Sequence, residues 1–239
     1  MTRMIGGPSK YLQERRLWFK WISIDWMLGM FLAYVVYLIV NYVYRSDKYI
    51  PTILAITMLF VYKIFNKQAW KFLYTASHFR QGLDGEALVA EELKKLPDEY
   101  VVIQDVKIPN TKTNIDFVVL GTNGIFAIEV KSHEGNITYN GQELLRNGYS
   151  LKKNFLWQVR FEATSLTEYL HANVDRNLYA NALLVFSSFK AKLRFGESPV
   201  TGVVIIGRAW LIKHITSHVA QQTLKSEYIE QIVSLFHSG

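Results

Sequence analysis

The chain has 239 residues, of which 50% are hydrophobic, and it contains no cysteine. This length suits one domain of roughly 150 residues plus an extension, and the missing cysteine excludes disulfides and thiolate zinc sites. The net charge of +7 belongs wholly to the N-terminal part, because residues 1–79 carry ten Lys/Arg and three Asp/Glu whereas residues 80–239 carry seventeen of each sign. The basic balance is therefore not a nucleic-acid footprint of the C-terminal part, where the linear sequence shows no local basic patch.

The N-terminal part contains a long uncharged stretch. Trp26–Tyr44 has nineteen residues without a formal charge, and a helix of about twenty such residues spans a bilayer core of roughly 30 Å. Aromatic residues typical of membrane interfaces lie at its two ends, namely Trp18, Trp21, Trp26, Tyr42 and Tyr44. The sequence therefore predicts a transmembrane helix.

A second apolar segment follows after a brief polar break. Tyr49–Tyr62 is uncharged, and the run reaches Phe65 if Lys63 extends its amine to the interface. We expect a membrane anchor of two transmembrane helices, a helical hairpin, over residues 1–65, and an amphipathic linker over residues 66–81. A buried helical hairpin of a soluble protein is the alternative.

The distribution of Lys and Arg predicts the orientation of this anchor. Five of these residues precede the first segment, two lie between the segments, and four follow at Lys63, Lys67, Lys71 and Arg80. Because cytoplasmic flanks carry the excess of positive charge, both termini and the C-terminal domain are expected in the cytoplasm. The predicted location is the cell membrane, with the lipid bilayer as a partner.

Residues 114–131 form the most informative stretch of the C-terminal part. Two apolar runs, Ile115–Leu120 and Ile125–Val130, flank a Gly/Asn-rich turn, which is typical of a β-hairpin. Asp116, Glu129 and Lys131 interrupt these runs. Charges in a buried strand are costly unless they are paired or bound to a metal ion, so these three residues are candidates for a functional site.

The register of the hairpin decides which charges meet. If Leu120 pairs with Ile125, Asp116 lies opposite Glu129, and Lys131 shares the same sheet face. A two-residue loop at Asn123-Gly124 would instead pair Asp116 with Lys131 in a buried salt bridge. We favour the first register, in which two carboxylates and an amine converge.

The remaining pattern predicts an α/β fold over residues 82–239, with a mixed sheet flanked by helices. Helices are expected at 86–96, at 155–171 after the N-cap Asn154, and at 226–236. Strands are expected at 100–106, at 182–186 and 200–206, and in short pieces at 137–139, 143–146 and 149–151.

Asp116, followed after twelve residues by Glu129-Val130-Lys131 on the second strand of a hairpin, resembles the PD-(D/E)-x-K nuclease superfamily. Gly82–Glu86 upstream, Gly135–Ile137 after the hairpin and Gln158 narrow the resemblance to the nuclease-related domain (NERD) family, over roughly residues 80–215. The resemblance implies a restriction-endonuclease-like core. Three positions depart from the residues common in that family, namely Phe117, Ser132 and Phe155.

The resemblance also implies roles for individual residues. Asp116, Glu129 and the carbonyl of Val130 would bind Mg²⁺ or Mn²⁺, and Glu86 would be an outer metal or water ligand. The alternative for Glu86 is an acid that stabilises a helix N-terminus.

Two further roles follow from the same resemblance. Lys131 would orient or deprotonate the attacking water. Gln158 would help to hold water or Lys131, and its alternative is an ordinary surface glutamine.

Two functions are therefore expected in order of preference. The first is a membrane-anchored, metal-dependent nuclease that hydrolyses nucleic-acid phosphodiester bonds at the cytoplasmic face, on DNA more than on RNA. The alternative is a catalytically inactive, membrane-tethered module that retains the nuclease fold and binds nucleic acid or protein.

Overall fold

The computed structural model describes residues 2–7, 10–43, 49, 52–53, 56, 63, 81–111, 114–196, 198–219 and 223–237. The chain divides into two compact units. One unit contains Met1–Lys10 and Gly82–Gly239, and the other contains Tyr11–Gln81. Each unit is described by itself.

Most of the described residues of the second unit lie in one long helix, α1 (Lys10–Val43). Most of the predicted second segment, residues 49–65, and nearly all of the predicted linker, residues 66–81, lie outside the described residues. Among the residues that are described, no helix combines the length and apolar character needed to cross a bilayer. The structure thus does not support the predicted transmembrane hairpin.

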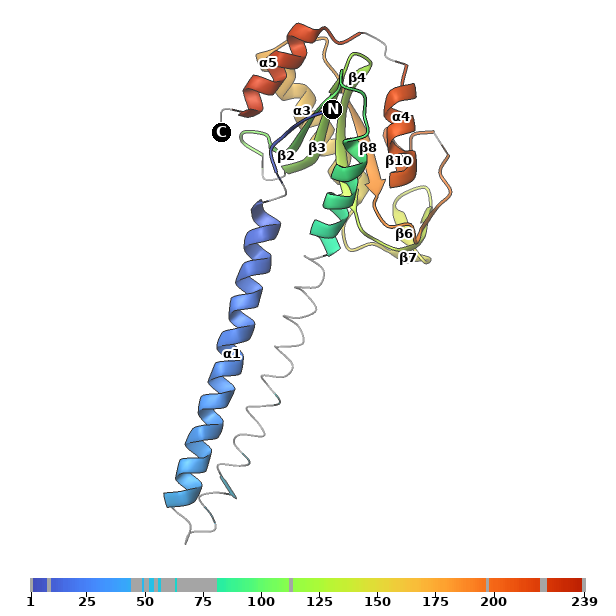
Figure 1. Cartoon of the computed structure of the whole chain (residues 1–239). Helices are drawn as coiled ribbons and strands as arrows, with labels where there is room; N and C mark the ends of the chain where they lie inside the picture. Colours follow the sequence, from blue (N-terminus) through green and yellow to red (C-terminus); the bar gives the residue numbers. More distant parts are fainter. Residues whose placement is uncertain are drawn as a thin grey trace. The chain divides into compact units, whose positions relative to one another are not determined.

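The first unit is built on a six-stranded mixed sheet (Figure 1). Its strands lie in the order β1 (Arg3–Ile5), β2 (Val101–Lys107), β3 (Asn114–Gly121), β4 (Gly124–Lys131), β8 (Ala180–Phe186) and β10 (Val203–Gly207). β2, β3 and β4 form an antiparallel meander, whereas β1 pairs with β2, β8 with β4, and β10 with β8 in parallel. Strands β4, β8 and β10 therefore all end at the same edge of the sheet.

Strand β1 was not predicted. It comes from residues that the sequence assigned to the anchor, and Ile5 is buried in the hydrophobic core of the first unit. The folded unit thus includes the N-terminal residues in addition to the predicted residues 82–239.

The side chains of each strand alternate between the two faces of the sheet. Each face carries an apolar core, and helices pack against both cores. Val118 and Leu120 point into a core that contains residues of α3 (Phe155–Asn173) and α5 (Ser226–His237). Phe117 and Val119 point into a second core. The helical residues 81–93 and α4 (Leu211–Ser217) contribute to that second core. The mixed sheet flanked by helices agrees with the predicted fold class.

A small second sheet lies outside this sandwich. It has four strands in the order β7 (Tyr149–Ser150), β6 (Leu144–Arg146), β5 (Gly135–Tyr139) and β9 (Ala191–Leu193). The first three were predicted, and β9 was not. A 3-10 turn, η1 (Arg208–Trp210), links β10 to α4.

The hairpin has the register that we favoured. Leu120 pairs with Ile125, and Gly121 pairs with Gly124, so the loop consists of Thr122 and Asn123. The alternative loop at Asn123-Gly124 is therefore wrong. Asn123 instead fixes the turn by donating a hydrogen bond from Nδ2 to the carbonyl of Ile215, at 2.6 Å.

The upstream helix begins earlier than expected. Residues 81–93 are helical, so Glu86 lies in the helix interior rather than in its first turn. On this helix Val89 and Leu93 are fully buried, whereas Leu88 is 44% exposed. The alternative interpretation of Glu86, as an acid that stabilises the helix N-terminus, is therefore wrong.

Candidate active site

The carboxyl end of β4 carries a cluster of charged residues on the face covered by α3. Asp116 lies one position before the last hairpin pair, Phe117 with Ile128, and its Oδ2 accepts a hydrogen bond from the backbone N–H of Val130 at 2.7 Å. This contact brings the Asp116 carboxylate to the strand that carries Glu129. Val130 therefore takes part in the site through its N–H, whereas the role of its carbonyl as a metal ligand stays a prediction from the family resemblance.

The environment of Asp116 opposes its negative charge. Burial, followed by repulsion from Glu129 and then from Glu86, raises the pKa of Asp116 well above its ordinary value. Attraction to Lys131 and the hydrogen bond from Val130 offset this only in part. The three acids thus lie close enough to repel one another, which is an arrangement that a cation would relieve.

Lys131 forms an ion pair with Glu129, its neighbour two positions back on the same strand face. Its Nζ contacts Glu129 Oε1 and lies 4.8 Å from the centroid of the Phe155 ring. Burial lowers the pKa of Lys131, but attraction to Glu129 and Asp116 outweighs it and raises the pKa overall. The amine therefore carries its positive charge at neutral pH.

Helix α3 adds two polar residues to the cluster. Asn154 caps the helix by accepting a hydrogen bond from the N–H of Trp157 at 3.0 Å, which fixes the start of the first turn. Gln158 then points at the sheet, where its Nε2 donates to Glu129 Oε1 at 2.7 Å and to Glu162 Oε1 at 2.9 Å. The surface-glutamine alternative for Gln158 is wrong.

Glu162 is the residue of this cluster that the sequence analysis missed. It is 1% exposed, and burial together with repulsion from Glu129 raises its pKa to about 9. A sequence signal existed, because Glu162 lies four positions after Gln158 and falls within the buried stripe of α3 that includes Val159 and Leu166. An acid inside such a stripe is a candidate site residue.

Glu86 reaches the cluster from the other side of the sheet edge. It is 6% exposed and contributes to the raised pKa of Asp116. The preceding Gly85 permits this approach, since a Cβ there would lie 2.8 Å from Ser187 Oγ and 3.2 Å from Ser132 Cβ. The glycine thus lets the helix pack directly on the ends of β4 and β8.

The acidic side chains decide whether this cluster can bind a metal ion. Glu129 Oε2 is buried and accepts no hydrogen bond from any described residue. The described side chains do not, however, include a ready-made group of three or more His, Cys, Asp or Glu residues at metal-binding spacing. A divalent ion would therefore be bound by the Asp116–Glu129 pair together with backbone and water oxygens.

Comparison with known proteins agrees with this geometry. The family model described as nuclease-related domain matches residues 81–206, which span the helix before the sheet, the hairpin, α3, β8 and β10. No curated protein and no solved structure matches the chain. Since the matched residues make up more than half of the sequence and include every residue of the cluster, the chain belongs to the nuclease-related domain family.

Proposed function

We propose that the protein is a metal-dependent nuclease that hydrolyses phosphodiester bonds, in DNA in preference to RNA. The observation that carries this proposal is the convergence of Asp116, Glu129 and Lys131 at the carboxyl end of β4, with one oxygen of Glu129 buried and unpaired. Membership of the nuclease-related domain family supports it.

Asp116 and Glu129 would hold Mg²⁺ or Mn²⁺, with the Val130 carbonyl as a further ligand and Glu86 as an outer ligand. Hard cations of this kind prefer carboxylate, carbonyl and water oxygens. When bound, such an ion supplies charge neutralisation and a more acidic water. Glu129 Oε2, which is buried and accepts no hydrogen bond from the described residues, would gain a partner in such an ion.

Lys131 would then act on the phosphate and the attacking water. Its charged amine, held beside the carboxylates by Glu129, offers hydrogen-bond donors where negative charge develops during hydrolysis. Gln158 positions Glu129 through their 2.7 Å hydrogen bond. Lys131 would orient or deprotonate the attacking water.

The test is cleavage of supercoiled DNA and of single-stranded RNA by the full-length protein in detergent, with Mg²⁺, Mn²⁺ or EDTA. We expect metal-dependent cleavage that Lys131→Ala and Asp116→Asn abolish and that Lys153→Ala, at an exposed position before α3, leaves unchanged. A wild-type protein that binds nucleic acid but never cleaves it would instead favour the inactive binding module.

We also propose that the protein is attached to the cell membrane through its N-terminal region, with the nuclease-related domain in the cytoplasm. The support is the uncharged stretch Trp26–Tyr44, where Leu28, Phe31 and Ile39 are 56%, 62% and 57% exposed, and the excess of Lys/Arg on its flanks.

The attachment and its orientation can be tested separately. Retention in the membrane fraction through high salt and alkaline carbonate would support the attachment, and release by carbonate would contradict it. A reporter fused after Gly239 should be active only inside the cell.

A further inference from the structure

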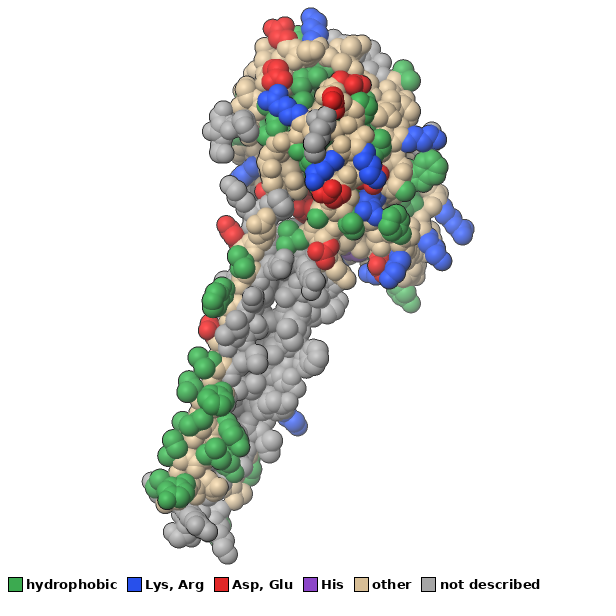
Figure 2. All heavy atoms as spheres, viewed as in Figure 1, with side chains coloured by type: hydrophobic (Ala, Val, Ile, Leu, Met, Phe, Trp, Pro, Cys, Tyr) green, Lys and Arg blue, Asp and Glu red, His purple; other side chains and the backbone are tan. Residues whose placement is uncertain are grey.

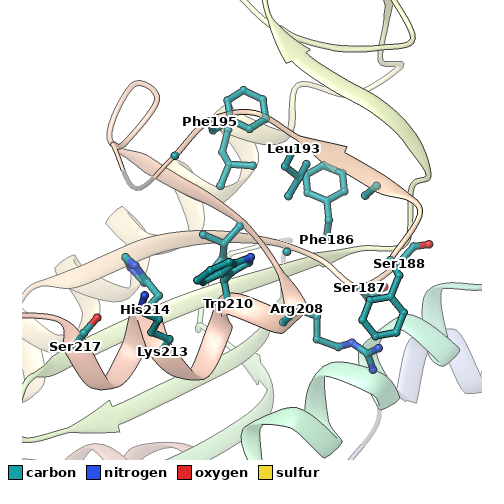
Figure 3. A pocket seen from close by; sticks show the side chains of 17 residues that line it. Phe186, Ser187, Ser188, Leu193, Phe195, Arg208, Trp210, Lys213, His214 and Ser217 are labelled. Carbon is teal, nitrogen blue, oxygen red and sulfur yellow. The ribbon is translucent and has the colours of Figure 1, made fainter.

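A pocket of about 510 Å³ opens at the ends of β8 and β10. Figure 3 shows aromatic rings of Phe186, Phe195 and Trp210 around one space, with Arg208 and Lys213 on either side of Trp210. The pocket thus combines aromatic surfaces with two cationic groups.

This pocket lies next to the candidate active site. Strands β4, β8 and β10 are parallel neighbours, and their carboxyl ends carry Lys131, Ser187 and Arg208 in that order. The backbone N–H of Ser187, which lines the pocket, donates to the carbonyl of Lys131 at 3.0 Å. Ligands of α/β proteins commonly bind along such an edge, so one extended ligand can contact both sites.

Two aromatic residues of the pocket are largely exposed. Phe189 is 79% and Trp210 is 59% exposed. A cation lies against each ring, since Arg208 Cζ is 4.4 Å from the Phe189 centroid and Lys213 Nζ is 5.1 Å from the Trp210 centroid. Large exposed rings beside cations are the features with which proteins stack unpaired bases and contact the adjoining phosphates.

Strand β9 and its flanks supply further positive charge. Along residues 189–195 the side chains alternate, so that Phe189, Ala191, Leu193 and Phe195 line the pocket, while the intervening residues are Lys190, Lys192 and Arg194. The three cations of this segment are exposed.

With Arg208 and Lys213, residues 187–213 carry five cations against the single acid Glu197, and Glu134 from outside this range lies 3.8 Å from Lys190. The domain as a whole is neutral, so this local basic surface differs from its surroundings. Figure 2 shows Lys and Arg side chains on the side of this unit where Figure 1 places α4, β6 and β7.

We propose that this pocket binds an unpaired base of a single-stranded nucleic acid, stacked on Trp210 and Phe189, with adjoining phosphates on the basic surface. The proposal rests on the proposed function for the class of ligand, and it deepens that function by assigning a preference for single strands. A base in a duplex is already stacked and paired, and therefore cannot enter the pocket without first leaving the helix.

The test measures binding by the full-length protein in EDTA, where no metal-dependent cleavage occurs. The probe is a fluorescently labelled oligothymidylate, compared with a blunt duplex of equal length. We expect tighter binding of the single strand, and a weakening of about 5- to 150-fold for Trp210→Ala, the range for loss of one stacked base. Phe189→Ala should also weaken binding, whereas Trp210→Phe should restore most of it.

The matched control is Tyr179→Ala. Tyr179 is 70% exposed and lies just before the amino end of β8, whereas the pocket lies at the carboxyl end. Its removal should therefore leave binding unchanged. Tryptophan fluorescence gives a second readout. The emission of wild type minus that of Trp210→Phe is the emission of Trp210, and the bound oligonucleotide should quench it. Equal affinities of Trp210→Ala, Phe189→Ala and Tyr179→Ala, or equal affinity for the duplex, would overturn the proposal.

Binding and cleavage separate the two proposals. If wild type cleaves nucleic acid but Trp210→Ala binds as wild type does, the pocket assignment fails and the nuclease proposal stands. If wild type never cleaves but loses single-strand binding on Trp210→Ala, the pocket assignment stands alone.

Discussion

The two carboxylate oxygens of Glu129 have different surroundings. Oε1 accepts hydrogen bonds from Lys131 and Gln158, whereas Oε2 is buried and accepts none from the described residues. The neighbouring acids Asp116 and Glu162 both have raised pKa values. The metal-free site therefore crowds acids whose negative charge, when they ionise, one lysine only partly neutralises.

This charge predicts stabilisation by a divalent ion. Millimolar Mg²⁺ or Mn²⁺ should raise the melting temperature of the full-length protein, with a gain of about 1–3 kcal/mol, because an ion that binds only the folded state stabilises it. Glu129→Gln should reduce this gain, since it removes one anionic ligand at nearly constant shape. Lys131→Ala should retain or increase it while hydrolysis is lost.

A thermal melt with and without Mn²⁺ for wild type and the two variants checks this prediction. If the cluster were only a buried salt bridge, Mn²⁺ would leave the wild-type melting temperature unchanged, and Lys131→Ala would cause the larger loss of stability.

Glu162 predicts a dependence of stability on pH. Its pKa rises from the ordinary 4.5 to about 9 on folding, so the folded state holds a proton that the unfolded state releases. The stability linked to Glu162 is fully present below pH 4.5 and is lost as the pH rises to about 9. Glu162→Gln should therefore flatten the fall in stability over this window, by an amount on the order of 1 kcal/mol or more.

Denaturant melts from pH 5 to pH 9 in EDTA measure this effect. Glu168→Gln, at an exposed position on the same helix, is the control and should follow wild type. A Glu162→Gln curve that is parallel to wild type would show that the proton is not held.

At the scale of elements, the long and strongly patterned segments were predictable from the sequence. The β3–β4 hairpin follows from two β-branched runs around a Gly/Asn turn, and α3 follows from its Asn154 cap and apolar period. Strands β1 and β9 have three residues each and α4 has seven, which is too short for a periodic signal to develop.

The parts of the site that depend on tertiary contacts were harder to predict. The basic surface joins Lys190, Lys192 and Arg194 to Arg208 and Lys213, which are separated in sequence by β10 and its approach. Only the parallel pairing of β8 with β10 brings them to one edge. The linear sequence therefore does not reveal this basic surface, because the fold brings its residues together.

The contact of the helix over residues 81–93 with the strand ends gives a prediction at Gly85. Gly85→Ala would place a Cβ 2.8 Å from Ser187 Oγ, so we expect the helix to shift and Glu86 to move away from Asp116. Stability should fall by about 1–3 kcal/mol, the usual cost of overpacking. Metal-induced stabilisation should weaken as well.

Adding Ser187→Ala to Gly85→Ala removes the closest contact and should recover part of both losses in melts with and without Mn²⁺. An additive double variant would show that Ser187 is not the obstacle.

At the scale of the whole molecule, the first unit takes residues from both ends of the sequence. β1 pairs with β2 through Arg3, Met4 and Ile5, although almost a hundred residues separate the two strands. A fragment that begins near residue 82 therefore lacks an edge strand that the full chain supplies.

This architecture predicts that Ile5 contributes to the stability of the sheet unit, most of which lies far from it in the sequence. Ile5 is 7% exposed, so Ile5→Ala should lower the free energy of unfolding by about 2 kcal/mol, at the lower end for a buried isoleucine because β1 is an edge strand. Arg3→Ala removes only an exposed ion pair with Glu230 and should cost less than about 1 kcal/mol. Denaturant melts compare the two, and equal losses would contradict the role of Ile5.

The position of β1 has a consequence for proteolysis. Residues 11–81 connect β1 to the helix at 81–93, so the chain closes a ring through the noncovalent β1–β2 ladder. One nick within this ring yields two polypeptides that still share a sheet. In the intact chain the β1–β2 pairing is intramolecular, and closing the loop between the two strands costs roughly 4 kcal/mol of entropy. After the nick, the same pairing holds together two separate polypeptides, which dissociate on dilution. A single cleavage would therefore leave the two fragments joined only by the contact of the three-residue strand β1 with β2.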